Sequence, residues 1–152
     1  MYKYTFGGLK NIYLLNGYEI RETPHGEAVS FVDGEGLERA ICDALATKKG
    51  KLTGTELRYL RTSGLKMSQA GLAKILEVNV QSVARWEKNG RAPNAPEKLL
   101  RIYYRSAVNG NMTAKAVIES INTLERAMVQ QTIVLKESRG TWNSKFKELE
   151  AA

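Results

Sequence analysis

The 152-residue sequence contains a single cysteine and a single histidine. One thiol cannot build a disulfide framework, and one cysteine with one histidine cannot supply the four ligands of a structural zinc ion. Cys42 follows the apolar spacing of Leu37, Ile41 and Leu45, which is typical of a small buried hydrophobe. We therefore predict no metal and no cofactor, and we assign Cys42 to the core.

Long apolar runs are also missing. No stretch approaches the roughly 20 residues that span a bilayer. Residues 1–17 lack the ordered charged, apolar and small-residue regions of a secretory signal. Because 43% of the residues are hydrophobic and 26% are charged, the chain can bury a core as one compact domain with appendages. We expect a soluble cytoplasmic protein with no membrane partner.

Motifs of catalysis are scarce as well. His25 stands alone in a Pro-His-Gly turn, without a carboxylate pair, a nucleophile motif or a metal constellation beside it. The glycine pairs at 7–8 and 34–36 lack the glycine spacing and lysine of a phosphate loop, and we interpret them as turns. We predict no catalytic residue, no enzymatic activity and no small-molecule substrate.

Residues 52–93 contain the start and stop signals of three short helices. Thr53 and Glu56 have capping-box spacing, and Gly64 favours the end of that first helix. Ser68 is a suitable cap for a second helix, and Asn79 is a suitable cap for a third. Three capped helices in so short a segment predict a helix-turn-helix unit.

One set of side chains in this unit is spaced to face inward. Small Ala73 permits close packing of the second and third helices, and Trp86 lies on the face expected to be buried, which argues against an RNA-stacking platform. The predicted core residues are Leu57, Leu60, Leu65, Leu72, Leu76, Val78 and Val83.

Another set lies on the open side of the third helix. A helix N-terminus placed in the major groove presents such side chains to base edges, where Gln suits adenine and Arg suits guanine. We predict base reading by Val80, Gln81, Ser82 and Arg85. Gln69, at the positive end of the second helix, is predicted to bind phosphate, as are the residues just past the third helix, Lys88, Asn89 and Arg91.

The positive charge is concentrated on this part of the chain. Residues 48–107 carry 13 lysines and arginines against 4 acidic residues, a net +9, whereas residues 1–47 carry net −3 and residues 108–152 net +1. A net basic segment that coincides with the motif is the electrostatic pattern expected for binding double-stranded DNA. A solvated basic face alone would leave the capped helices unexplained.

The segment MSQAGLAKILEVNVQSVARWEKNGRAP resembles the Xre/Cro-type helix-turn-helix family, with SQ at the second helix and RWE-x-x-G at the end of the third. The resemblance implies a structural ion pair between Arg61 and Glu87. It also assigns phosphate contact to Gln69 and base contact to Gln81 and Arg85. The first connection, residues 64–67, is longer than in that family.

LTGTELRYLR, the RAP segment and PEKLLRIYYR are similar to the helix-turn-helix half of MqsA-type antitoxins. Those proteins are dimers that repress their own operons and bind a toxin. Their N-terminal zinc module, with paired CxxC motifs, has no counterpart in this chain, so its N-terminal half contains a hydrophobic core in place of the metal or a different module.

The first 48 residues have strand signals. Residues 12–15, Asn16-Gly17 and residues 18–20 predict a hairpin, and residues 28–32 predict another strand. Residues 37–45 predict an amphipathic helix. Lys48, Lys49 and Lys51 then form a basic connection that either touches phosphate or is a solvated linker.

The C-terminal segment has a heptad-like stripe that predicts a helix over residues 114–137. We interpret the stripe as a dimer interface, because a DNA-reading dimer needs a two-fold contact. Residues 141–152 are expected to form a short docked helix or a tail. The residues of the stripe are Val117, Ile121, Leu124, Met128 and Leu135.

Together these patterns predict a mainly α (α+β) fold with three parts. Residues 1–48 form a small β-rich module with one helix, residues 49–108 a five-helix Xre-type DNA-binding domain, and residues 109–152 a helical dimerisation segment. The predicted function is that of a homodimeric, sequence-specific repressor acting on an inverted repeat. The alternative is an antitoxin that neutralises a toxin protein and autoregulates its operon.

Overall fold

A computed structural model describes residues 1–108 and 131–148. The helices are α1 (Gly34–Thr47), α2 (Gly54–Tyr59), α3 (Gln69–Leu76), α4 (Val80–Asn89) and α5 (Asn94–Val108), with short η1 (Phe6–Gly8) and π-helical η2 (Leu60–Gly64). The strands are β1 (Tyr2–Lys3), β2 (Ile12–Leu14), β3 (Tyr18–Thr23), β4 (Gly26–Phe31), β5 (Gln131–Ser138) and β6 (Thr141–Glu148). In the described part of the chain, no helix combines the length and apolarity needed to cross a membrane.

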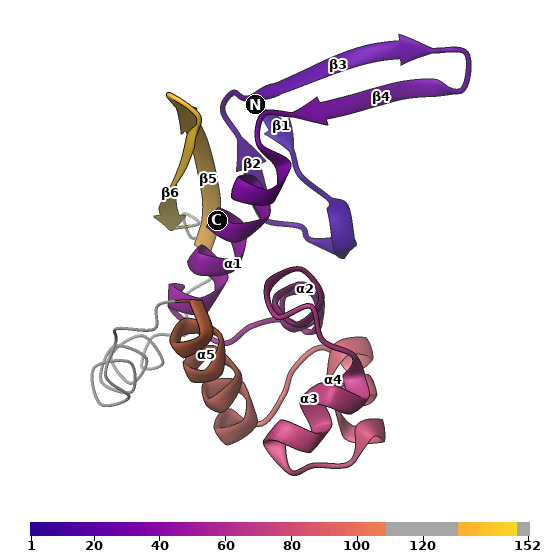
Figure 1. Ribbon diagram of the computed structural model, residues 1–152, viewed down its shortest axis with the longest axis vertical. Coiled ribbons are helices and arrows are strands. Elements are labelled where there is room, and N and C mark those ends of the chain that lie inside the picture. The colour runs from indigo at the N-terminus through magenta and orange to yellow at the C-terminus, as the bar shows by residue number, and fades with distance from the viewer. Residues whose placement is uncertain (109–130, 149–152) are drawn as a thin grey trace.

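Four of the strands form one sheet in the order β1-β2-β5-β6. The central pair, β2 and β5, is parallel and joins the two ends of the described chain, with Leu14 opposite Leu135. The outer pairs are antiparallel. Figure 1 shows this sheet and α1 on one side of the molecule and α2 to α5 on the other. The α+β composition therefore agrees with the expected fold class.

The hairpin predicted around Asn16-Gly17 is wrong. β2 pairs with β1 and β5, whereas β3 pairs with β4. Asn16 bonds across to β5 instead, since its Oδ1 accepts from the N–H of Glu137 at 2.7 Å and its Nδ2 donates to the carbonyl of Glu137 at 3.1 Å. At Asn16-Gly17 the chain thus leaves the four-stranded sheet, and the side chain of Asn16 holds the neighbouring strand β5 in place.

The C-terminal helix predicted over residues 114–137 is wrong from residue 131 onward. Residues 131–148 form β5 and β6, joined by a turn in which Gly140 has φ +79°. Leu135 is fully buried within the sheet, so it is a core residue and not part of a seam between helices. The β-branched run Thr132-Ile133-Val134 favours the strand. The other stripe residues, Val117, Ile121, Leu124 and Met128, lie outside the described residues.

The expected docked helix or tail at residues 141–152 is also wrong over the described part, because Thr141–Glu148 is strand β6. Trp142 explains why this strand is held in place. Its side chain is 7% exposed, and its Nε1 donates to the carbonyl of Val32 at 2.8 Å. The C-terminal hairpin is therefore joined to the segment that precedes α1.

Helix α1 lies between the sheet and the remaining helices. The helix predicted over residues 37–45 is confirmed and extends to Gly34–Thr47, with the carboxylate of Asp33 accepting the N–H of Gly36. Cys42 is fully buried, as expected. Burial raises the pKa of its thiol to about 12, so the side chain stays neutral. The buried apolar residues of α1 belong to one hydrophobic core that they share with the sheet and the other helices.

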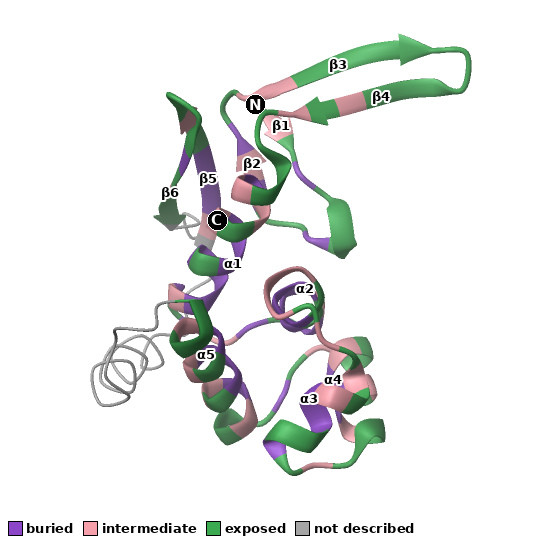
Figure 2. Ribbon diagram, in the orientation of Figure 1, coloured by how far each residue is buried: buried purple, intermediate pink, exposed green. Residues whose placement is uncertain are grey.

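Strands β3 and β4 form a separate two-stranded hairpin. It projects away from the rest of the molecule, and most of its residues are exposed (Figure 2). Only its base is packed, where the ring of Tyr2 lies 5.2 Å from that of Tyr18 and 5.9 Å from that of Phe31. The outer part of the hairpin makes few contacts with the core.

We predict that Leu135→Ala destabilises the protein by about 2 to 5 kcal/mol, because it opens a cavity at a fully buried position of β5. The measurement is urea unfolding followed by circular dichroism. Lys136→Ala, at the exposed next position of β5, is the matched control and is expected to change stability by less than about 0.5 kcal/mol. Equal stability of the two variants would contradict the core position of Leu135.

Candidate nucleic-acid interface

Three of the helices begin at the caps that the sequence predicts. Thr53 and Glu56 form a complete capping box at α2. The hydroxyl of Ser68 accepts the N–H of Gly71 at 3.0 Å, and the amide oxygen of Asn79 accepts the N–H of Gln81 at 2.9 Å. These bonds satisfy amide groups that the first helical turns leave unpaired. Residues 49–108 contain four α-helices, and α1 packs against them as the fifth.

The core of this unit follows the predicted inward face. Val83 is fully buried, Ala73 is 3% exposed between α3 and α4, and Trp86 is 9% exposed. Leu65 and Val78 are only partly buried. Gly54 permits the contact between α2 and α4, because a Cβ at this position would lie 2.4 Å from the carbonyl oxygen of Glu87. The three helices therefore have a fixed relative position.

The ion pair that the resemblance implies is present. The Nε and Nη2 of Arg61 contact Oε2 and Oε1 of Glu87 at 2.7 and 2.8 Å, and Nη1 donates to the carbonyl of Met67 at 2.8 Å. The two side chains are only 8% and 5% exposed. Gln69 also donates through Nε2 to Oε1 of Glu87 at 3.1 Å. The bidentate pair thus joins η2, which contains Arg61, to α4, which contains Glu87. The bond from Gln69 joins the beginning of α3 to the same carboxylate.

The side chains predicted to read bases form the open face of α4. Gln81 and Arg85 are exposed, Val80 is 39% exposed, and Ser82 is partly exposed. Arg85 lies beside Ser82, with 3.5 Å between Nη2 and Oγ. The residues predicted to bind phosphate beyond this face, Lys88, Asn89 and Arg91, are all exposed. Gln69 is partly buried, and one of its two amide hydrogens is directed to Glu87.

The charges of residues 48–107 are divided between interior and surface. Three of the four carboxylates in this segment are paired inside the fold, as Glu56–Lys48, Glu87–Arg61 and Glu97–Arg101. The fourth, Glu77, is exposed. These pairs use three of the thirteen basic residues, so the whole excess of +9 lies outside them. The surface of this unit is strongly cationic.

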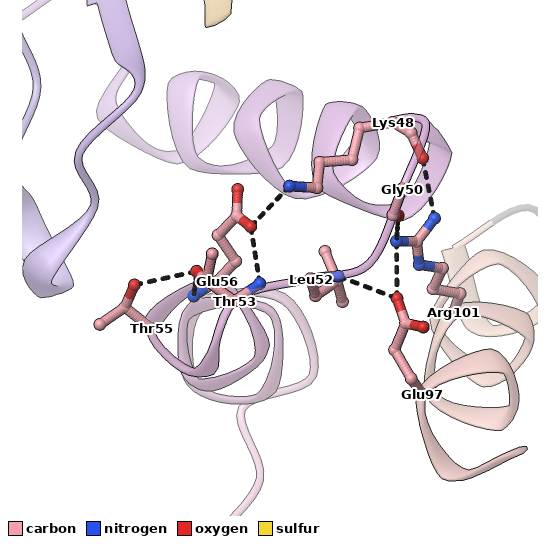
Figure 3. Close-up of polar contacts among 8 residues, drawn as sticks. All are labelled: Lys48, Gly50, Leu52, Thr53, Thr55, Glu56, Glu97 and Arg101. Carbon is pink, nitrogen blue, oxygen red and sulfur yellow. Dashed lines mark hydrogen bonds and ion pairs between the residues drawn. The ribbon is translucent and has the colours of Figure 1, made fainter. Parts of the chain in front are cut away.

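Both sequence-based interpretations of Lys48 are wrong. Its side chain is buried, and its Nζ lies 2.7 Å from Oε1 of Glu56, so it is neither a solvated linker residue nor available to phosphate. Lys51 is partly exposed and donates weakly to the carbonyl of Ala92 at 3.5 Å. These interpretations fail because the connection from α1 to α2 is packed between α2 and α5, as Figure 3 shows.

The sequence interpretation missed Glu97 and Arg101, which hold this connection. Arg101 is fully buried, lies 2.6 Å from Oε1 of Glu97, and donates to the carbonyls of Lys48 and Gly50 at 2.9 and 2.5 Å (Figure 3). The same carboxylate oxygen accepts the N–H of Leu52 at 3.0 Å. Their i,i+4 spacing was a usable signal of an ion pair, although it carries no information on burial.

Residues 57–97 match the family model described as helix-turn-helix. No curated protein and no solved structure matches the chain. The matched segment contains α3, α4 and the exposed face described above, and it excludes the sheet. The match and the geometry together identify a helix-turn-helix domain of the kind found in DNA-binding transcription regulators.

We predict that Arg61→Ala costs about 3 to 5 kcal/mol of unfolding free energy, because it leaves the carboxylate of Glu87 buried without its partner. Urea unfolding measures the loss. The exposed Arg58→Ala, which removes the same side chain one turn earlier, is the control and is expected to change stability by less than about 0.5 kcal/mol. A loss of similar size in both variants would show that the buried pair has no special structural role.

Proposed function

We propose that this protein is a sequence-specific DNA-binding repressor. The observation that carries the proposal is the exposed polar face of α4, presented on a rigid scaffold whose surface carries the excess positive charge. The N-terminal part of α4 enters the major groove, where Gln81 contacts adenine, Arg85 contacts guanine, and Val80 contacts a thymine methyl group. Ser82 adds a hydroxyl donor and acceptor on the same face.

Phosphate contacts fix the position of this helix on the duplex. Lys88, Asn89 and Arg91 bind the backbone beside the end of α4. Gln69 contributes through the amide hydrogen that is not directed to Glu87, and through its place at the N-terminal end of α3. These contacts are independent of sequence and make the affinity depend on salt.

The repressor acts as a homodimer on an inverted repeat, with two α4 helices in successive major grooves roughly 34 Å apart. Repression occurs by occlusion of a promoter, including the promoter of its own gene. The interface is proposed for the stripe residues Val117, Ile121, Leu124 and Met128, which lie outside the described residues. Leu135 is removed from this set because it belongs to the sheet.

Arg85→Ala is expected to cost about 1 to 3 kcal/mol at its cognate base and to relax the base preference there, whereas Lys88→Ala should weaken binding to all sequences similarly. The measurement is fluorescence anisotropy with the gene's own upstream DNA and with a scrambled duplex, at one salt concentration, with the mass of the protein determined in parallel.

Equal losses for Arg85→Ala on the two duplexes would refute base reading by Arg85. Equal and weak binding of the unaltered protein to both duplexes would refute autoregulation. A monomeric mass in the complex would refute the dimer.

A second function, that of an antitoxin, is favoured by the β3–β4 hairpin. Glu22 lies directly opposite Glu27, and Ile20 lies opposite Val29 on the same face. Like charges in opposed positions are destabilising, and a two-stranded hairpin is marginally stable alone in water. We propose that this face binds a basic protein, such as a ribonuclease toxin, which would cover the apolar pair and neutralise both carboxylates.

The test uses the protein encoded by the adjacent gene, coexpressed and titrated by calorimetry. The double variant Glu22→Gln with Glu27→Gln is expected to weaken the complex by about tenfold or more while leaving DNA binding unchanged. Glu19→Gln, on the opposite face of the same hairpin, is the control. The antitoxin proposal fails if the adjacent protein does not bind, or if the double variant and the control bind it equally.

A further inference from the structure

Lys10 is an exposed residue on a backbone that is fixed on both sides. Leu9 before it is 2% exposed, and Ile12 after it is 1% exposed. The carbonyl of Asn11 accepts the N–H of Ile133 at 2.8 Å, which joins this segment to β5. The position of the Lys10 backbone is therefore set by the sheet, and only its side chain is free to move.

The segment before Lys10 also packs on the helix-turn-helix domain. The hydroxyls of Tyr4 and Tyr59 are 2.9 Å apart, and burial raises the pKa of both phenols, so both remain protonated and the bond is kept. At Gly7, where φ is +71°, a Cβ would lie 3.0 Å from the ring of Tyr59, and at Gly8 a Cβ would lie 3.3 Å from Thr55. η1 therefore lies directly on α2.

This arrangement brings Lys10 close to the end of α4. Lys10 and Asn11 line a pocket of about 440 Å³ together with Lys88 and Gly90, and the start of α2 contributes Thr53 and Thr55. Two segments far apart in the sequence thus place a lysine each at one surface depression. Lys88 is among the residues proposed to bind phosphate.

The carboxylates at this pocket do not neutralise the two lysines. Glu56 and Glu87 also line it, but Glu56 is paired with Lys48 and Glu87 with Arg61. Within residues 1–108 and 131–148, neither Lys10 nor Lys88 forms an ion pair. Two uncompensated cations held at one depression repel each other and favour an anion beside both of them.

We propose that Lys10 and Asn11 bind the phosphate backbone of DNA beside Lys88, so that the interface extends beyond residues 57–97 onto the sheet-bearing part of the chain. The inference rests on the proposed DNA-binding function. The Lys10 ammonium supplies a point charge and the Asn11 amide a neutral donor, and a phosphodiester accepts from both. The contact reads no base, and it lengthens the segment of duplex that the protein covers.

The test is the salt dependence of binding to a 30-bp mixed-sequence duplex, measured by fluorescence anisotropy. Loss of one phosphate contact in Lys10→Ala is expected to reduce the slope of log K against log salt by about 0.9, which corresponds to about fivefold weaker binding at 0.15 M salt. Lys10→Arg is expected to retain the slope. Lys145→Ala, an exposed lysine of β6 at the other end of the sheet, is the control and is expected to behave as the unaltered protein.

A slope for Lys10→Ala equal to that of the unaltered protein would overturn the inference and leave the proposed function in place. An equal reduction in Lys145→Ala would overturn it too, because it would show a general effect of net charge. Failure of the unaltered protein to bind either the mixed-sequence or the upstream duplex at low salt would overturn the proposed function itself.

Discussion

The buried guanidinium of Arg101 fixes the connection between α1, which packs on the sheet, and α2, the first helix of the helix-turn-helix domain. It holds the carbonyls of Lys48 and Gly50 and the carboxylate of Glu97, while that carboxylate holds the N–H of Leu52. The chain between α1 and α2 therefore has its polar backbone groups satisfied inside the protein, where unpaired groups would be costly. Among residues 1–108 and 131–148, Nε of Arg101 and Oε2 of Glu97 have no hydrogen-bond partner, so the value of this network lies in fixing geometry as well as in stability.

The same pairs explain how the domain presents its charge. Acidic side chains of residues 48–107 are turned inward, where each orients a helix or a connection, and Glu77 is the exception. Ten of the thirteen lysines and arginines of this segment lie outside these three pairs, so its surface carries a net positive charge. A cationic surface that is also rigid suits a polyanion with a regular spacing of charges.

The local features of the domain could be predicted from the sequence, because each depends on residues within a few positions. The caps at Thr53, Ser68 and Asn79 and the exposed face of α4 are of this kind. The sheet could not be predicted in this way. Asn16 and Glu137 are 121 residues apart, and nothing local distinguishes an Asn-Gly that closes a hairpin from one that fastens a distant strand.

For the charged residues as well, the sequence indicated roles that depend on nearby positions and missed roles that depend on distant ones. The backbone carbonyl of Lys48 is held by Arg101 of α5, 53 positions away, so the sequence around Lys48 could indicate only a basic connection. The heptad spacing placed Leu135 on the apolar face of a predicted helix. An apolar residue at this single position also fits a buried β-strand, so the spacing did not distinguish the two structures. The resemblance supplied the Arg61–Glu87 pair, which spacing alone does not reveal.

The parallel pairing of β2 with β5 means that helices α2 to α5 are an insertion between two paired strands of one sheet. During synthesis from the N-terminus, α2 to α5 emerge with mostly local contacts and can fold early, whereas β2 waits for the last strands to be made. The apolar residues Ile12 and Leu14 are uncovered on one side during that interval. A chain interrupted before residue 131 would thus retain α4 and expose an unpaired strand edge, a form suited to removal by proteases.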